Sequence, residues 1–525
     1  MAENKNYTNI PKEKFSFVHA GERISDKKFE DKPIGFFKDA WIRFRKSKAS
    51  VVAAIIIIVI ILYSFLAPVF ITTHDSTFMC GTYAKKPGRV TWLRPLGIAT
   101  GGVERNNNEA TFIKLQAIGV AAETPNGETM TLGQGMESEY QPILKVGKMY
   151  TQDLPGKKVA RYYPATIDTY LEVGFIYQSV EQQEYQRILD WQEQTGLQVV
   201  YPLIENNEYT FDVEDANFWY KAKQKGGMPV AIKNGQVKTL DYSEDMVLED
   251  NYKRDAEGNL VYYQYTGGGN VDTAQYKIRV LYYNYYQYKY GHLPNYIMGT
   301  DSQGYDLALR IAGGIQLSLM VAVSVSVINF ILGAAYGSVE GYYGGAVDII
   351  MERITDILSG VPFMVVATLF QIHLAKKVGA IPSLLFAYVL TGWIGTASRV
   401  RTQFYRFKNQ EYVMAARTLG ARDRRIIWKH IFPNTLGTII TSSALVIPGV
   451  ILSESMLSFL GIIKLGNAEQ TSLGTLLSDA SNIWTNYPHL MLYPALIISL
   501  LMVCFNLFGN GLRDAFNPSL RGVED

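Results

Sequence analysis

Charge-free apolar runs alternate with polar stretches along this chain, and the first run is the clearest. Residues 51–67 (VVAAIIIIVIILYSFLA) carry no charged side chain, and with their flanks they are about long enough to span a bilayer. A cleaved signal peptide is the alternative. However, a hydrophilic tail of nearly fifty residues precedes the run, and Pro68, Val69 and Phe70 make a poor small-residue cleavage site. The pattern therefore favours an uncleaved first span.

The second half of the chain carries the remaining apolar runs. They lie at 314–337, 353–375, 381–398, 436–460 and 489–508. Together with the first run they predict six membrane-spanning helices, so both chain termini should lie on the same side of the membrane.

The distribution of basic residues predicts which side that is. Four cations immediately precede the first span: Arg43, Arg45, Lys46 and Lys48. The loop 399–430 contains nine more, against only Glu411 and Asp423: Arg399, Arg401, Arg406, Lys408, Arg417, Arg422, Arg424, Arg425 and Lys429. Cytoplasmic loops carry such an excess, so we expect both termini and this loop in the cytoplasm. Lys376 and Lys377 fall on the outer side and oppose this topology only mildly.

Residues 71–290 have the composition of an ordinary soluble domain. Residues 181–193 (EQQEYQRILDWQE) have helical periodicity, whereas 197–204 and 259–265 resemble strands. We predict an α+β domain inserted between the first two spans and therefore extracytoplasmic. Its tyrosine-rich segment 282–290 (YYNYYQYKY) has two interpretations: amphipathic strands near the membrane interface, or a sticky surface for a peptide or partner.

Overall composition excludes several classes of function. The formal net charge is only +2, which gives no indication of nucleic-acid binding, and the 6 histidines show no metal-ligand spacing. Residues 81–291 contain no histidine, which weakens the case for an extracytoplasmic enzyme on a membrane anchor. A Gly-rich phosphate loop followed by Lys-Ser/Thr is lacking, so any ATPase must be another chain.

The basic loop ends in the most informative segment, EYVMAARTLGARDRRIIWKHIFPN at 411–434. Small residues at Ala415, Ala416 and Gly420 allow another protein to approach the backbone closely. Tyr412 and Leu419 can fill an apolar groove, while the flanking arginines can pair with an acidic surface. Pro433 limits how far a helix continues unchanged. The alternative is a basic loop that serves only to set the topology.

This pattern, Ala-Ala-Arg-x-Leu-Gly followed after nine residues by His-Ile-Phe-Pro, resembles the cytoplasmic loop of ABC importer permeases. Residues 298–306, 454–461 and 505–522 also resemble the peptide-importer branch, as does WIRFRKSKAS before the first span. The chain is similar to the C-type permease of oligopeptide and dipeptide importers over roughly 35–70 and 292–522. It departs at Met414, Asn510 and Asn517, where members commonly have acidic residues, and it lacks a Trp near position 473. Its 71–290 segment is much longer than the usual external link.

The resemblance implies a membrane all-α fold, a six-helix permease like that of type I ABC importers. It also implies a coupling helix that seats in a groove on the ATPase. The expected coupling residues are Glu411, Tyr412, Met414, Ala415, Ala416, Arg417, Leu419, Gly420 and Ala421. No catalytic residue, metal or cofactor is expected in this chain, because ATP and Mg²⁺ would bind the partner subunits. The implied partners are a second homologous permease, two cytosolic ATPases, an extracytoplasmic peptide-binding (lipo)protein, the peptide and membrane lipid.

Polar residues in the spans provide further candidates. Glu454 is a carboxylate at membrane depth, which by default marks a functional site, so it is a candidate for the translocation path. The alternative is a carboxylate hydrated or paired within the bundle.

Asp348, Glu352 and Asp356 share a helical face near the cytoplasmic mouth, where a solvated or gating network is expected. Five glycines suit close helix packing and a turn: Gly333, Gly337, Gly341, Gly344 and Gly345. Asp301 and Asp306 suggest a capped helix at the outer interface.

The predicted organisation follows from these elements. It comprises a cytoplasmic tail (1–48), a first span (49–70), the inserted domain (71–290), an outer interfacial segment (291–313), the permease core (314–510) with its coupling loop (399–434), and a cytoplasmic tail (511–525).

We predict a peptide-importing permease in a bacterial plasma membrane, with 71–313 extracytoplasmic. The alternatives are an importer of another small solute, such as a nickel chelate or glycan-derived cargo, and a membrane-anchored ligand receptor. The inserted domain is expected to dock or guide the binding protein.

Overall fold

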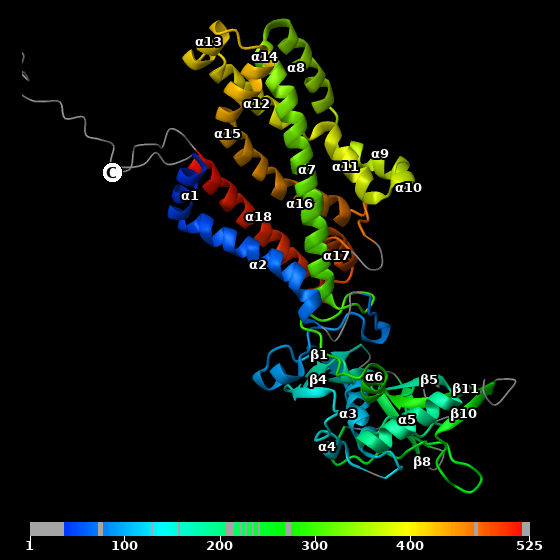
Figure 1. The fold of residues 1–525 in the computed structure, drawn as a ribbon. Helices are drawn as coiled ribbons and strands as arrows, with labels where there is room; N and C mark the ends of the chain where they lie inside the picture. The colour runs from blue at the N-terminus through cyan, green and yellow to red at the C-terminus, as the bar shows by residue number, and fades with distance from the viewer. Residues whose placement is uncertain are drawn as a thin grey trace, which may run out of the picture.

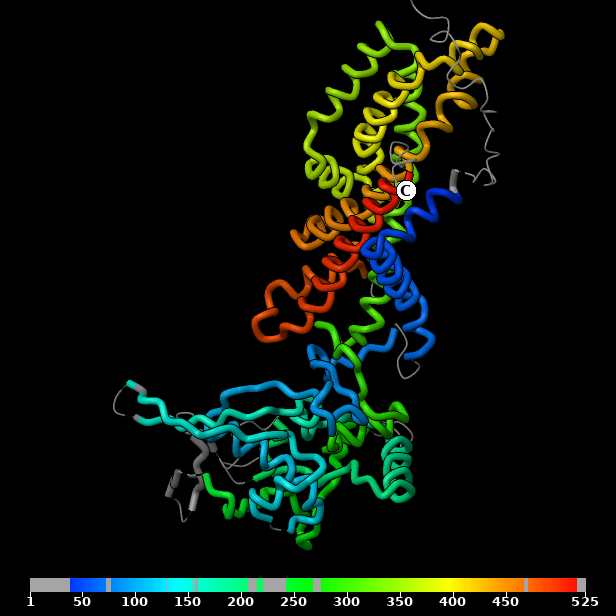
Figure 2. Tube along the Cα trace, turned by 90° about the vertical axis from the view of Figure 1, so that its left-hand side faces the viewer, coloured from blue at the N-terminus to red at the C-terminus, as the bar shows by residue number. Residues whose placement is uncertain are grey.

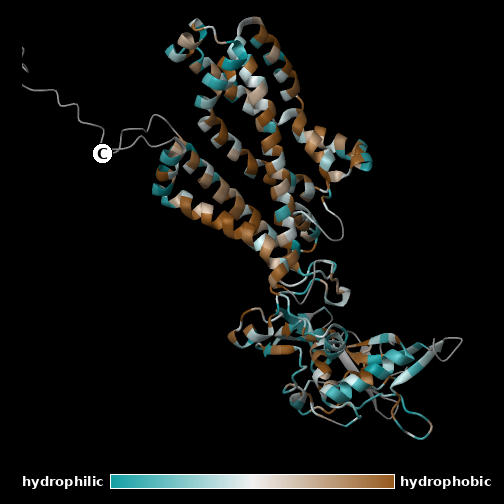
Figure 3. Ribbon diagram, viewed as in Figure 1, coloured by the Kyte–Doolittle hydropathy of each residue, from teal (hydrophilic) through white to brown (hydrophobic). Residues whose placement is uncertain are grey.

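The computed structural model describes residues 36–71, 77–128, 130–155, 158–205, 215–220, 223–225, 228–233, 236–239, 242–267, 275–466 and 471–516. They form a bundle of long helices with a mixed α and β domain at one end (Figure 1). The view turned by 90° shows the same separation (Figure 2). Apolar residues dominate the bundle and polar residues the other domain (Figure 3). The predicted fold class, a helical membrane permease with an inserted α+β domain, is confirmed.

Within the described residues, five helices are long and apolar enough to cross a membrane, or six if a bent pair counts as one span. They are α2 (Lys48–Phe70), α7 (Leu307–Tyr343), Ala380–Phe407 with its parts α11 (Ala380–Thr391) and α12 (Ile394–Phe407), Asp423–Phe459, and α18 (Pro488–Phe516). The bent pair joins α8 (Gly345–Ser359) to α9 (Phe363–His373) at 71°. Shorter helices are α1 (Phe36–Lys46), α10 (Ala375–Val378) and α17 (Leu473–Ala480).

The span Asp423–Phe459 is built from four pieces. These are α14 (Asp423–Arg425), a π-helical turn (Ile426–Ile431), α15 (Phe432–Ala444) and α16 (Val446–Phe459). Pro433 therefore does not end the helix. It sits in the first turn of α15, where its missing N–H costs no intrahelical bond, and the wider π turn lies directly before it.

Three of the predicted glycines bring α7 against α12. A Cβ on Gly337 would stand 2.2 Å from the carbonyl oxygen of Ala397, and one on Gly341 would stand 2.8 Å from that of Arg401. Gly333 meets Thr396 in the same way, with a Cβ at 2.6 Å. Gly344 and Gly345 both have positive φ (65° and 57°) at the turn into α8. The predicted roles in close packing and in a turn are confirmed.

The described residues of the inserted domain form three antiparallel sheets. One joins β1 (Gly102–Asn108), β4 (Lys158–Asp168) and β2 (Ile143–Val146), with β3 (Tyr150–Leu154) also pairing with β4. The second joins β10 (Tyr263–Gly267), β11 (Gln275–Leu281) and β5 (Phe175–Glu181), with β6 (Val200–Tyr201) on β11, and the third joins β7 (Lys223–Lys225), β8 (Met228–Lys233) and β9 (Gln236–Thr239). The helices are α3 (Glu109–Glu123), α4 (Leu132–Gly135), α5 (Gln182–Thr195) and α6 (Tyr282–Tyr290), with 3₁₀ turns at Gly81–Tyr83, Thr91–Leu96 (η3) and Leu171–Val173.

Local predictions in this domain had mixed outcomes. The helix expected over 181–193 is α5, while the strands expected over 197–204 and 259–265 are confined to the short β6 and to β10. Both interpretations of 282–290 were wrong. This segment is the helix α6, and Tyr282, Tyr285 and Tyr286 are buried in the domain's own core rather than facing a membrane or a partner. Tyrosine spacing alone did not distinguish a strand from a helix buried on one side.

The domain is joined to the bundle by two chain segments that pair with each other. The amide of Cys80 donates to the carbonyl of Gly304, and the amide of Thr300 donates to that of Lys86. Gly304 has φ of 100°, and a Cβ there would lie 2.1 Å from the Cys80 carbonyl oxygen. Asp306 caps α7 through the amide of Ala308 at 2.8 Å, as its spacing predicted. Residues 291–313 do not, however, form a separate interfacial helix, because α7 itself begins at Leu307.

Candidate functional site

A short helix, α13 (Glu411–Thr418), lies at the end of the bundle farthest from the inserted domain (Figure 1). Glu411 in its first turn and Arg417 in its last turn complement the helix dipole. Gly420 has φ of 79°, which lets the chain turn away directly after the helix. The result is a compact protrusion at the tip of the molecule.

One side of α13 is anchored and the other is exposed. Val413 is fully buried in an apolar cluster with Phe404, Ile426 and Ile431. Met414 is 52% exposed and Leu419 88% exposed, although both are apolar. Exposed apolar side chains on a rigidly anchored helix are typical of a protein contact surface.

Hydrogen bonds connect α13 to two spanning helices. The side-chain amide of Asn434, in α15, donates to the hydroxyl of Tyr412 over 3.2 Å. On α7, the hydroxyl of Tyr342 donates to Asp423 over 2.6 Å, and the guanidinium of Arg417 lies 5.8 Å from the centre of the Tyr342 ring. These contacts connect α13 directly to α15 and α7.

A basic cleft of about 480 Å³ opens next to this helix. It is lined by Arg422, Arg424, Arg425, Trp428 and Lys429. Four cations around one tryptophan give the tip a positive rim, which complements an acidic partner surface.

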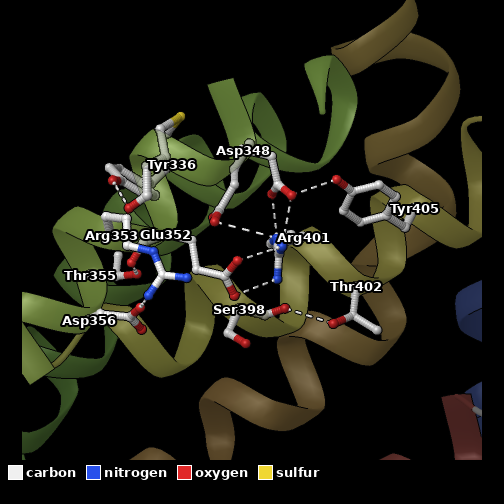
Figure 4. Close-up of polar contacts among 12 residues, drawn as sticks. Tyr336, Asp348, Glu352, Arg353, Thr355, Asp356, Ser398, Arg401, Thr402 and Tyr405 are labelled. Atoms are coloured by element: carbon white, nitrogen blue, oxygen red, sulfur yellow. Dashed lines mark hydrogen bonds and ion pairs between the residues drawn. The ribbon is translucent and has the colours of Figure 1, made fainter. Parts of the chain in front are cut away.

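Behind the tip, Arg401 of α12 binds two carboxylates of α8 (Figure 4). Its Nε and Nη2 contact Asp348 at 2.5 and 2.8 Å, and its Nη1 and Nη2 each contact Glu352 at 3.0 Å. Glu340 of α7 lies 3.4 Å from Nε, and the hydroxyl of Tyr405 donates to Asp348 over 2.8 Å. The cluster therefore fastens α7, α8 and α12 together.

The three acidic residues that share a face of α8 do not act together. Asp356 is turned away from Arg401 and pairs with Arg353 at 2.9 Å on the exposed side (Figure 4). From its sequence context Arg401 was assigned only to the cations that set topology, and its role here was missed. An i, i+4 pair of carboxylates just before one predicted span and an arginine just after the next, on the same side of the membrane, is the signal that could have found it.

Glu454 is 1% exposed where α16 packs against α7 and α17. The hydroxyls of Ser318 and Ser458 donate to its two oxygens over 3.1 and 3.0 Å. The structure thus shows the carboxylate hydrogen-bonded within the bundle, as in the alternative to a role in the translocation path. A part in the translocation path stays a prediction.

Two family models match separate parts of the chain. Residues 331–522 match the binding-protein-dependent transport system inner membrane component, and residues 35–83 match the N-terminal TM domain of oligopeptide transport permease C. Residues 84–330, which include most of the inserted domain, lie outside both matches.

Individual proteins give the same result. The oligopeptide transport system permease protein OppC of Bacillus subtilis (strain 168) is 41% identical over 223 residues, which is 42% of this chain and 72% of that protein. The dipeptide transport system permease protein DppC of the same strain is 42% identical over 225 residues, or 42% of this chain and 68% of that protein. Among solved structures, an inward-facing MetNI methionine ABC transporter is 14% identical, with a TM-score of 0.32 over 39% of this chain and 94% of that one.

Proposed function

Because this chain belongs to the family of binding-protein-dependent transport system inner membrane components, as an oligopeptide-type permease C, we propose that one end of the molecule couples to an ATPase and the other end receives the cargo. The chain is the pore-forming permease subunit of a peptide importer. At the tip of the bundle, α13 acts as the coupling helix, and at the opposite end the inserted domain faces the outside of the cell.

The arrangement of α13 supports the coupling role best. Val413 fixes the helix to the bundle while Met414 and Leu419 project outward, so a partner can bind the exposed side of the helix without displacing Val413. The basic cleft beside the helix favours an acidic rim on that partner. We propose that the partner is a cytosolic ATPase, one of two, that binds ATP and Mg²⁺.

Transport then requires two states of the assembly, biased by ATP in the partner subunits. Movement of the ATPase groove carries α13 with it. The contacts of Tyr412 with Asn434 and of Arg417 with Tyr342 pass that movement to α15 and α7. The Arg401 cluster moves α8 and α12 with α7 as one unit. A second permease completes the pore, and no covalent chemistry on the peptide is needed.

Replacing an exposed contact residue tests this role. The variant Leu419→Asp places a charge where an apolar groove is expected, and it should sharply reduce co-purification of the ATPases while the chain still folds, because Leu419 is 88% exposed. Val159→Asp is the matched control, since Val159 is an apolar side chain 59% exposed on the inserted domain. Normal ATPase binding and normal ATP-driven peptide uptake by the Leu419 variant would refute α13 as the coupling helix.

For the inserted domain we propose that it docks or guides an extracytoplasmic peptide-binding protein. Its position supports this, because it is attached where α2 ends and α7 begins, at the end of the bundle opposite α13 (Figure 1). Removing about residues 75–290 should impair uptake and leave assembly with the ATPases intact. Unchanged uptake together with unchanged affinity for the binding protein would refute the proposal.

Glu454 is proposed to act at a seam between α16, α7 and α17 that opens during transport. Its serine partners come from α7 and α16, so separation of these helices would expose the carboxylate to the path. A Glu454→Gln variant that keeps its assembly but shows altered preference for charged peptides would support this. An unchanged cargo profile would count against it.

A further inference from the structure

The 3₁₀ turn η3 and the residues after it expose a concentrated set of apolar side chains. Trp92 is 75% exposed, Leu96 is 69% exposed and Ile98 is 57% exposed. Three large apolar residues within seven positions are unusual on a domain whose surface is otherwise mainly polar (Figure 3). The segment lies outside both family matches.

This segment is rigidly built, so its apolar side chains are held outward rather than left loose. Thr91 donates through its amide and its hydroxyl to the side-chain oxygen of Asn295, at 3.0 and 2.6 Å. The amide of Val90 donates to Ala99 over 2.8 Å, closing the base of the loop. Gly97, with φ of 73°, makes the turn at its end.

The one charged side chain of the segment points inward. Arg94 pairs at 3.1 Å with Asp168, a carboxylate that is fully buried and is also bound by Arg89 at 3.2 Å. The tip of the loop is therefore apolar and carries no free cation. This chemistry favours an apolar partner over an acidic one.

The segment is also fixed relative to the spanning helices. Arg89, just before it, exchanges two backbone hydrogen bonds of 2.8 Å with Tyr296, about ten residues before α7 begins. The loop lies on the bundle-facing side of the inserted domain (Figures 1 and 2). The last turn of α2, from which the chain leads into the inserted domain (Figure 1), also exposes apolar side chains, with Val69 65% and Phe70 76% exposed.

We propose that Trp92, Leu96 and Ile98 insert into the membrane leaflet on the side of the inserted domain. Tryptophan is favoured at the interface between lipid and water, and the loop continues the apolar surface that α2 already presents to the same leaflet. The inserted domain thereby gains a third attachment besides α2 and α7, which restrains its tilt over the membrane. This inference goes beyond the proposed function and holds whether or not the domain recruits a binding protein.

Site-directed spin labelling of the full chain, assembled with its co-purifying subunits in phosphatidylcholine and phosphatidylglycerol liposomes, tests the proposal. The native cysteines, Cys80 and Cys504, are both buried, so a label is directed to an introduced cysteine. Leu96→Cys is the test position and Ile98→Cys provides a second one should the first fail to fold. Val159→Cys, on β4 of the same domain, is the matched exposed control.

The expected result is a ratio of oxygen to nickel-chelate accessibility several-fold higher at Leu96 than at Val159, as for a label in lipid. An equal, water-like ratio at the two positions would overturn the proposal. Low accessibility of Leu96 to both oxygen and the nickel chelate would also overturn it, because the loop would then be covered by another protein subunit.

Discussion

The membrane bundle and the inserted domain differ in the residues that pack their interiors. In the bundle, glycines on α7 bring backbone against backbone, and large apolar side chains such as Ile58 and Val69 are left facing outward. In the inserted domain, a cluster of tyrosines and two buried arginines fills the interior. Lipid supplies no hydrophobic drive between helices, so close packing holds the bundle, whereas water drives bulky aromatic groups inward in the domain.

The largest loss of stability is expected when a side chain is added at a glycine contact in the bundle. In Gly337→Leu the new Cβ alone would meet the Ala397 carbonyl oxygen at 2.2 Å, so α7 and α12 must separate. Overpacking usually costs about 1–3 kcal/mol, and a backbone obstacle places this variant at or above the upper end. We expect loss of a monodisperse complex in fluorescence-detected size-exclusion chromatography.

Gly449→Ala is the control for that variant, because a Cβ there meets nothing within 4 Å. Hydrogen exchange in the inserted domain should be unaffected by either change. If Gly337→Leu destabilised the inserted domain as much as the bundle, the two regions would not be separate in their packing.

Next in size is the ionic cluster behind the coupling helix. Arg401→Ala leaves Asp348, Glu352 and Glu340 without their shared cation. Two of these carboxylates, Asp348 and Glu340, are buried, and leaving them unpaired costs on the order of 3 kcal/mol. We expect a lower midpoint of thermal unfolding and a loss of peptide-stimulated ATP hydrolysis. Arg401→Lys should restore only part of the lost thermal stability and ATP hydrolysis, because an ammonium group cannot donate the paired hydrogen bonds that the guanidinium gives to each carboxylate.

Arg353→Ala is the matched control, an arginine on the exposed side of α8. Its side chain is 72% exposed, so its pair with Asp356 should contribute about 0.5 kcal/mol or less. Equal effects of the two arginine variants would show that burial does not set the strength of this cluster.

A smaller and more local effect is expected from the ionic centre of the inserted domain. Asp168→Asn keeps the shape but leaves Arg89, only 1% exposed, without its counter-charge, at a cost of about 2–3 kcal/mol. Faster hydrogen exchange should be confined to this domain, with ATPase assembly unchanged. Altered exchange in α7 or α12 would contradict that separation.

The smallest effect concerns pH and Tyr163, which is buried beside Phe112 in a separate apolar cluster of the inserted domain. Burial, and secondarily the Glu109 carboxylate, raises the pKa of Tyr163 to about 12, from an ordinary value near 10. The stability that this tyrosine contributes is therefore complete below pH 10 and is lost as the pH rises toward 12. Exchange in the inserted domain should quicken in that range. Tyr163→Phe should move the onset to higher pH, and an unchanged onset would exclude Tyr163 as a contributor.

Sequence patterns predicted the features that depend on composition over long windows or on a dense motif. The apolar runs located the spanning helices, because a bilayer demands about twenty apolar residues in succession. The spacing of Gly333, Gly337 and Gly341 marked the α7 packing face, and Asp306 marked the start of α7. The segment 411–434 identified the family, although the coupling role of its residues stays a prediction.

Tertiary structure alone decided which distant residues meet. Arg401 was one cation among many until α12 packed beside α8 and brought it to Asp348 and Glu352. The tyrosines of α6 are core residues because the sheet of β5, β6 and β11, the helix α5 and the Gly81–Tyr83 turn enclose them. Their local sequence pattern does not indicate those neighbours. Likewise, Trp92 and Leu96 became notable only once folding had paired Arg94 with the buried Asp168 and left the two apolar side chains exposed. Local periodicity records the solvent that a segment faces, but it does not record which remote segment will cover it.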